Sequence, residues 1–139
     1  MIPPGHWLIY TVFTLFLYGL WGFFSKLATY YIDPKTALLY EVCGTILVTL
    51  LCFSSNDFRW QGEIRGILYA IAVGVSGTLA TLCFFIAISK ASATVVLPLT
   101  SLYPAITVLL AFLILNEPIS WRQGLGILLA IAASALLSL

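Results

Sequence analysis

Five long apolar segments account for most of this 139-residue chain and restrict what it can fold into. Hydrophobic residues make up 62% of the sequence and charged residues 8%, whereas roughly a quarter of the residues in a soluble domain are charged. Each segment is close to the length of about 20 residues that a helix needs to cross a bilayer, and none alternates with the period of a barrel strand. We therefore predict an all-α integral membrane protein with a bundle of five transmembrane helices. The predicted helices cover residues 7–25, 36–53, 66–89, 93–115 and 121–139.

The polar connections between these segments are short and predict a single transmembrane domain over residues 1–139. The longest connection is too short to hold a soluble domain. Two helix starts carry clear signals. Asp33 followed by Pro34 is typical of an N-cap and a first-turn proline, and Ser120 with Gln123 forms a capping box before the last helix.

Few side chains here are suited to catalysis, metal binding or nucleic-acid binding. The single histidine, His6, lies at the N-terminus, and the three cysteines fall inside apolar segments without CxxC spacing. No nucleophile with a base and no phosphate-binding loop can be assembled, and the net charge is +1. We predict that the protein is not an enzyme, that it uses no cofactor or metal, and that its partners include the lipid bilayer but no nucleic acid.

Positive charges do not decide the orientation of the chain in the membrane. Five helices place the termini on opposite faces, and the six basic residues divide three against three between those faces. If Lys26 is counted as intramembrane, the balance leans towards an N-terminus inside the cell. One alternative is that the chain inserts in both orientations, which would allow an inverted pair of copies. The other is that so few charges carry no information about orientation. The two groups are Lys26, Lys35 and Lys90, and Arg59, Arg65 and Arg122.

Glu41 is the strongest candidate for a working residue. It lies about five residues into the second apolar segment, where an ionisable side chain is costly enough to suggest a function. Counting from the turn at Asp33, Lys26 reaches a similar depth in an antiparallel hairpin, so we expect the two side chains to pair. Two interpretations remain open: a structural ion pair, or a carboxylate coupled to proton or substrate with Lys26 as its partner or as a substrate contact.

The fourth apolar segment contains two prolines, Pro98 and Pro104, with Thr100 and Ser101 between them. Each proline removes a helical hydrogen bond and frees the carbonyl four residues earlier, at Thr94 and Thr100. We therefore predict a kinked or broken helix. Freed carbonyls at membrane depth are tolerated where protein or water satisfies them, so this segment is a candidate hinge and pathway lining. The alternative is a purely structural proline kink.

Two aromatic residues are candidates to line a cavity beside these groups. Trp21 lies deep in the first segment, and Tyr103 lies in the fourth segment, directly before Pro104. Their rings offer apolar faces together with an indole or hydroxyl donor. For each of them, ordinary packing is the competing interpretation.

Residues 102–130, together with Trp21-Gly22 and Lys26, resemble an EamA domain of the drug/metabolite transporter superfamily. The most specific part is the Asn116-Glu117-Pro118 turn followed by Gln123 and Gly124, and the resemblance covers essentially the whole chain. Many members carry two such domains, whereas this sequence contains one. The resemblance therefore implies a half-sized transporter that pairs with itself or with a second small subunit.

A shorter stretch, Glu41-Val42-Cys43-Gly44-Thr45, is similar to a segment of the small multidrug resistance proteins. In those four-helix relatives the glutamate binds a cation and a proton alternately, which implies the same role for Glu41. This chain departs from them in carrying Lys26 at a similar depth, which would hold Glu41 in a pair.

These observations together predict a secondary transporter of a small metabolite or drug-like molecule in the cell membrane, working as a dimer by alternating access. Glu41 would be the switchable charge, and the segment between Pro98 and Pro104 the flexible wall. The alternative is a non-transporting membrane subunit, or half of a heteromeric flippase for a lipid-linked molecule.

Overall fold

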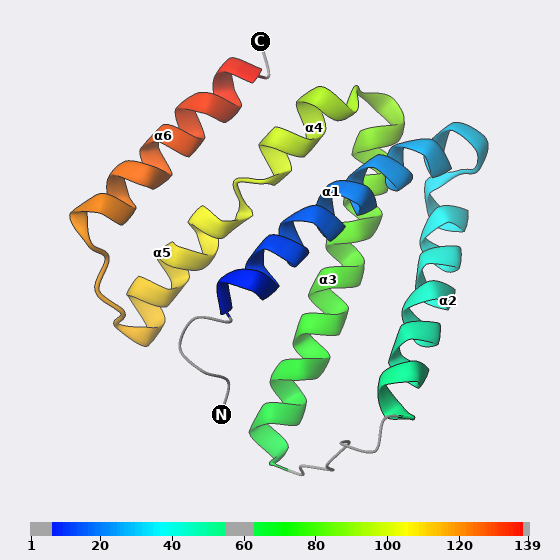
Figure 1. The fold of residues 1–139 in the computed structure, drawn as a ribbon, viewed down its shortest axis with the longest axis horizontal. Helices are drawn as coiled ribbons and strands as arrows, with labels where there is room; N and C mark the ends of the chain where they lie inside the picture. Colours follow the sequence, from blue (N-terminus) through cyan, green and yellow to red (C-terminus); the bar gives the residue numbers. More distant parts are fainter. Residues whose placement is uncertain (1–6, 55–62, 138–139) are drawn as a thin grey trace. The chain divides into compact units, whose positions relative to one another are not determined.

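The computed structural model describes residues 7–54 and 63–137, and these residues are almost entirely helical (Figure 1). The chain divides into two compact units, Met1–Lys90 and Ala91–Leu139. The all-α prediction is confirmed. The helices are α1 (Trp7–Tyr31), α2 (Pro34–Phe53), α3 (Ile64–Lys90), α4 (Ala93–Thr100), α5 (Tyr103–Leu115) and α6 (Trp121–Leu137).

Within the part of the chain that the structure describes, four stretches are long and apolar enough to cross a membrane: α1, α2, α3, and α4 with α5 taken together. α6 is also apolar but has 17 residues, so the count of five spanning helices stays a prediction. Large apolar side chains cover the helix surfaces, with Phe16 and Leu51 each 66% exposed. Such a surface is unfavourable in water and suits contact with lipid.

The first two helices extend beyond their predicted limits. α1 continues to Tyr31 rather than ending at residue 25, and α2 begins at Pro34 rather than at residue 36. Hydropathy marks the part of a helix that suits lipid, whereas the helix itself ends only where a backbone signal stops it. That signal is Asp33, whose carboxylate accepts hydrogen bonds from the backbone N–H groups of Lys35 and Thr36.

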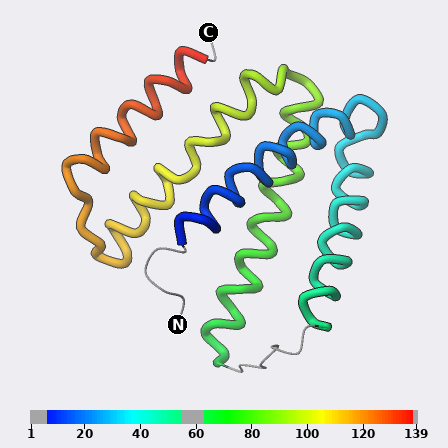
Figure 2. The backbone as a smooth tube through the Cα atoms, in the orientation of Figure 1, coloured from blue at the N-terminus to red at the C-terminus, as the bar shows by residue number. Residues whose placement is uncertain are grey.

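In the first unit, α3 packs against both α1 and α2 (Figure 2). The buried residues of this unit are concentrated at one end of the three helices. They lie in the second half of α1, the first turn of α2 and the last turns of α3. These residues are Gly22, Ser25, Ala37, Phe84, Phe85 and Ile88.

In the second unit, the fourth apolar segment is divided into two helices, as its prolines predict. α4 ends at Thr100 and α5 begins at Tyr103. α6 then packs against α4. Pro98 lies inside α4, and the second proline falls in the first turn of α5, where its missing N–H costs nothing.

The turn between α5 and α6 is defined by backbone conformation. Asn116 adopts a left-handed conformation with φ 54°, which asparagine tolerates better than most residues. The next backbone N–H, of Glu117, bonds back to the carbonyl of Ala111 at 3.3 Å. Ser120 and Gln123 form the predicted capping box, with the Ser120 N–H donating to Gln123 Oε1 at 2.8 Å.

Candidate functional site

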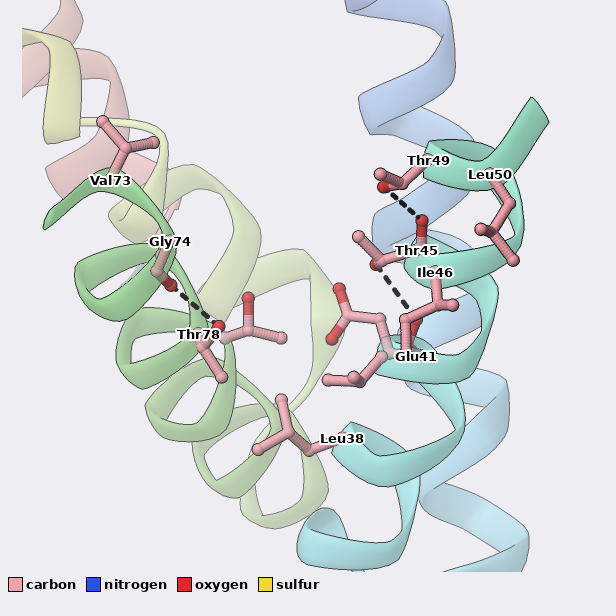
Figure 3. A pocket seen from close by; sticks show the side chains of 12 residues that line it. Leu38, Glu41, Thr45, Ile46, Thr49, Leu50, Val73, Gly74 and Thr78 are labelled. Carbon is pink, nitrogen blue, oxygen red and sulfur yellow. Dashed lines mark hydrogen bonds between the residues drawn. The ribbon is translucent and has the colours of Figure 1, made fainter. Parts of the chain in front are cut away.

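Glu41 lies on the wall of an open groove of about 430 Å³ between α2 and α3. Its carboxylate points from α2 into this space (Figure 3). Thr45 and Thr49 follow Glu41 at intervals of four residues, so all three side chains lie on one face of α2. Gly74 and Thr78 of α3 line the opposite wall. The groove therefore has a carboxylate near one end and hydroxyl groups along its length.

A tryptophan on α1 holds this carboxylate. The indole Nε1 of Trp21 donates a hydrogen bond to Glu41 Oε1 at 3.1 Å, and the contact is partly buried. The indole stacks on Phe84 of α3, with ring centroids 4.7 Å apart and the planes inclined by 26°. Tyr18 approaches it edge-on at 6.5 Å. The structure thus brings two predicted site residues, Trp21 and Glu41, into direct contact.

Lys26 has a different partner from the one expected. Its Nζ donates to the backbone carbonyl of Ile88, in the last turns of α3, at 2.6 Å, and lies 5.0 Å from the centre of the Tyr30 ring. The prediction that Lys26 pairs with Glu41 compared their distances from the turn along the chain, and it assumed that α1 and α2 are antiparallel and have the same tilt. In the structure α1 is inclined to α2 (Figure 1), so Trp21, more than a turn before Lys26, is the α1 residue that meets Glu41.

Three of the four threonines that line the groove use their hydroxyl protons within their own helices. Thr45 donates to the carbonyl of Glu41 at 3.1 Å, Thr49 to the carbonyl of Thr45 at 2.8 Å, and Thr78 to the carbonyl of Gly74 at 2.8 Å. A hydroxyl has one proton and two lone pairs, so each of these oxygens retains acceptor capacity only. These three oxygens and the carboxylate offer hydrogen-bond acceptors to a ligand, which favours cations and donors.

The second unit contains the predicted hinge residues. The carbonyl of Pro98 accepts hydrogen bonds from Ser101 Oγ at 2.7 Å and from Ser134 Oγ of α6 at 3.1 Å. Ser134 is buried, at 5% exposure. The Leu102 N–H, which would bond Pro98 in a continuous helix, bonds instead to Leu99 at 3.3 Å. Side-chain hydroxyls therefore satisfy the carbonyl at the break.

The other candidates of this unit surround the same break. Thr100 Oγ1 donates to the carbonyl of Val96 at 2.9 Å, within α4. Tyr103 is 61% exposed at the start of α5. A small cavity of about 140 Å³ lies between the start of α5 and α6, lined by residues that include Ser101, Pro104 and Gly126. Sequence reasoning expected freed carbonyls at Thr94 and Thr100 and did not foresee the role of the Pro98 carbonyl.

Several residues of the site were missed by sequence reasoning. Thr45 and Thr49 carried a usable signal, because they repeat at helical spacing from Glu41. Phe84 carried none, since it is one of many aromatic residues in an apolar segment. Among residues 7–54 and 63–137, no three His, Cys, Asp or Glu side chains gather in a way that would hold a metal ion.

Comparison with known proteins confirms the resemblance to an EamA domain. The model of the EamA-like transporter family matches residues 5–139. An uncharacterized protein of Methanocaldococcus jannaschii is 30% identical over 122 residues, which is 88% of this chain and 88% of that protein. No solved structure matches the chain.

Proposed function

This chain belongs to the EamA-like transporter family, and we propose that it is a secondary transporter that carries a small metabolite or drug-like molecule across the cell membrane. The family and the four long apolar stretches among the described residues make it an integral membrane protein. The family is one of transporters rather than enzymes.

The observation that carries this proposal is Glu41 in an acceptor-lined groove. A partly buried carboxylate can be neutralised by a proton or by a bound cation, and the two compete for the same oxygens. The threonine oxygens beside it extend the acceptor surface along α2 and α3. We therefore narrow the cargo to molecules with a positive charge or a hydrogen-bond donor, exchanged for protons at Glu41.

Lys26 takes a different role in this proposal from the one its depth suggested. Its ammonium group lies at the C-terminal end of α3, where the helix dipole and the last carbonyls favour a cation. We assign it to holding α1 against α3, which leaves Glu41 available to the cargo. A carboxylate committed to a lysine would lose that freedom.

We further propose that all five apolar segments span the membrane and that two copies, or this chain and a similar small subunit, form the working transporter. Secondary transporters commonly place their site between two related repeats and alternate access by rocking one against the other. Each copy would contribute one Glu41 groove. The α4–α5 break, with Tyr103 beside it, would be a flexible segment of the second unit.

Transport into proteoliposomes tests this function directly. Vesicles loaded with the pH indicator pyranine would be exposed to a panel of organic ammonium ions, and proton efflux would be followed on imposing an outward proton gradient. Glu41→Gln removes the titratable group at nearly constant size, so we expect it to abolish exchange. Glu117→Gln is a matched control, because Glu117 lies in the turn between α5 and α6.

Two results would contradict the proposal. Exchange that persists in Glu41→Gln with an unchanged response to the proton gradient would remove the carboxylate from the mechanism. An absence of exchange for every cation tested, combined with stable association with a larger membrane protein, would favour a non-transporting subunit.

A further inference from the structure

The hydrogen bond between Trp21 and Glu41 depends on a third residue on a third helix. Phe84 of α3 is 7% exposed, and its ring is stacked against the indole. Phe84 on α3 contacts Trp21 on α1, and Trp21 in turn donates to the carboxylate of Glu41 on α2. We infer that Phe84 is a positioning residue, which acts on Glu41 only by fixing the orientation of Trp21. This inference rests on the proposed role of Glu41 in the transporter.

The geometry explains how a phenylalanine can control a carboxylate that it does not bond. The indole N–H lies in the plane of the ring, so the direction in which it donates is set by the orientation of that plane. Phe84 supports one face of the indole, and Tyr18 meets it at an interplanar angle of 77°. These contacts restrict the two side-chain torsions of Trp21 and keep Nε1 within 3.1 Å of Glu41 Oε1.

Fixing one oxygen of the carboxylate orients the whole group. With Oε1 held on the side of α1, the carboxylate stays directed into the groove, which is lined by residues of α2 and α3 (Figure 3). Without Phe84, the indole is free to rotate away and the carboxylate loses its fixed donor. Glu41 then samples several rotamers, and a bound cation must bear the cost of ordering it.

The adjacent residue Phe85 provides a matched control. It is as well buried, at 3% exposure, and its ring centroid is 6.4 Å from that of Phe84. Successive helical residues point about 100° apart, so Phe85 lies on a different face of α3. Replacing either phenylalanine by leucine removes a similar amount of packing, but only Phe84→Leu removes the support of the indole.

The first test uses the fluorescence of Trp21 and needs no transport. Replacing Trp7, Trp60 and Trp121 by phenylalanine leaves Trp21 as the single reporter, and its emission is followed as the pH is changed. We expect a pH-dependent transition that Glu41→Gln abolishes, because the charge beside the indole is then constant. Phe84→Leu should weaken or remove the transition, whereas Phe85→Leu and the ring-preserving Phe84→Tyr should retain it.

The second test is a double-mutant cycle on cation binding. Affinity for tetraethylammonium is measured in the original chain, Phe84→Leu, Trp21→Phe and the double variant. We expect each single change to weaken binding by about tenfold, on the order of one hydrogen bond to a charged group. The double variant should be no weaker than Trp21→Phe, because Phe84 has nothing left to position.

Specific results would overturn the inference. They are a parent without any pH transition at Trp21, a transition unchanged in Phe84→Leu, equal losses in Phe84→Leu and Phe85→Leu, or additive losses in the cycle. If Glu41→Gln abolishes transport while Phe84→Leu leaves binding unchanged, the positioning role fails and the proposed function stands. If Glu41→Gln transports normally, the function fails whatever the fluorescence shows.

Discussion

The carbonyl of Pro98 has two hydroxyl donors, and removing them singly and together should give different energies. In Ser134→Ala the carbonyl keeps its bond from Ser101 Oγ at 2.7 Å, and in Ser101→Ala it keeps the bond from Ser134 at 3.1 Å. The bond from Ser134 joins α6 to α4, and hydrogen bonds between membrane helices contribute about 0.6 kcal/mol on average. The bond from Ser101 is local to the end of α4, and its contribution is of the same order. We therefore expect each single substitution to lower the free energy of unfolding by about that amount.

The double substitution leaves the carbonyl without either hydroxyl. A fully buried acceptor left unsatisfied costs roughly 1–3 kcal/mol, and Pro98 is half-buried, so the cost lies at the lower end. The loss in the double variant should therefore exceed the sum of the single losses by about 1 kcal/mol. Unfolding by sodium dodecyl sulfate in mixed micelles, followed by circular dichroism, measures these differences. Ser76→Ala is a suitable control, because Ser76 is exposed on α3 and bonds only within its own helix.

Strictly additive losses at Ser101 and Ser134 would refute this reasoning. They would mean that the break is stabilised by packing alone and that water or another group satisfies the carbonyl as soon as one hydroxyl is lost. A loss from Ser76→Ala as large as that from Ser134→Ala would show that the assay reports general effects of serine removal.

Two further predictions concern charged residues near one end of the first unit. Lys26→Met should lower the free energy of unfolding by about 1–2 kcal/mol, because it removes a charge-assisted bond to the carbonyl of Ile88; Lys35→Met, at an exposed position, should have little effect in the same assay, and equal losses would contradict the assignment. The pKa of Asp33 is held below its usual value, first by the Thr36 hydroxyl and then by the Thr36 N–H, so its contribution to stability is present above pH 3.8 and lost as the pH falls through the lowered pKa. Comparing the original chain with Asp33→Asn from pH 7 to pH 3 should show a difference that shrinks on acidification, and a constant difference would exclude this origin.

Local signals in the sequence were sufficient for most of the fold. Apolar length predicted the helical membrane architecture, the prolines predicted the break in the fourth segment, and Ser120 with Gln123 predicted a helix start. These features depend on a few neighbouring residues, so one sequence contains the information. The helix ends at Tyr31 and Pro34 were missed because lipid contact and helical structure do not stop at the same residue.

Contacts between helices were predictable only in part. Glu41 was identified from its cost in an apolar segment, and the structure places it in the groove. The expected pair with Lys26 failed because it required the inclination of α1, which residue counting does not provide. Phe84 could not be found at all, since its importance depends on which face of α3 meets Trp21.

The uneven burial of the first unit has a mechanical consequence. Among its described residues, 7–54 and 63–90, the buried ones lie where the end of α1, the start of α2 and the end of α3 meet, while the opposite halves of α2 and α3 are exposed. The packed end holds the three helices together, and the exposed halves of α2 and α3 would pivot about it. A small tilt of α2 would widen the distant mouth of the groove by several times the displacement at Glu41. Glu41 itself would move little, because it lies close to the packed end of the unit.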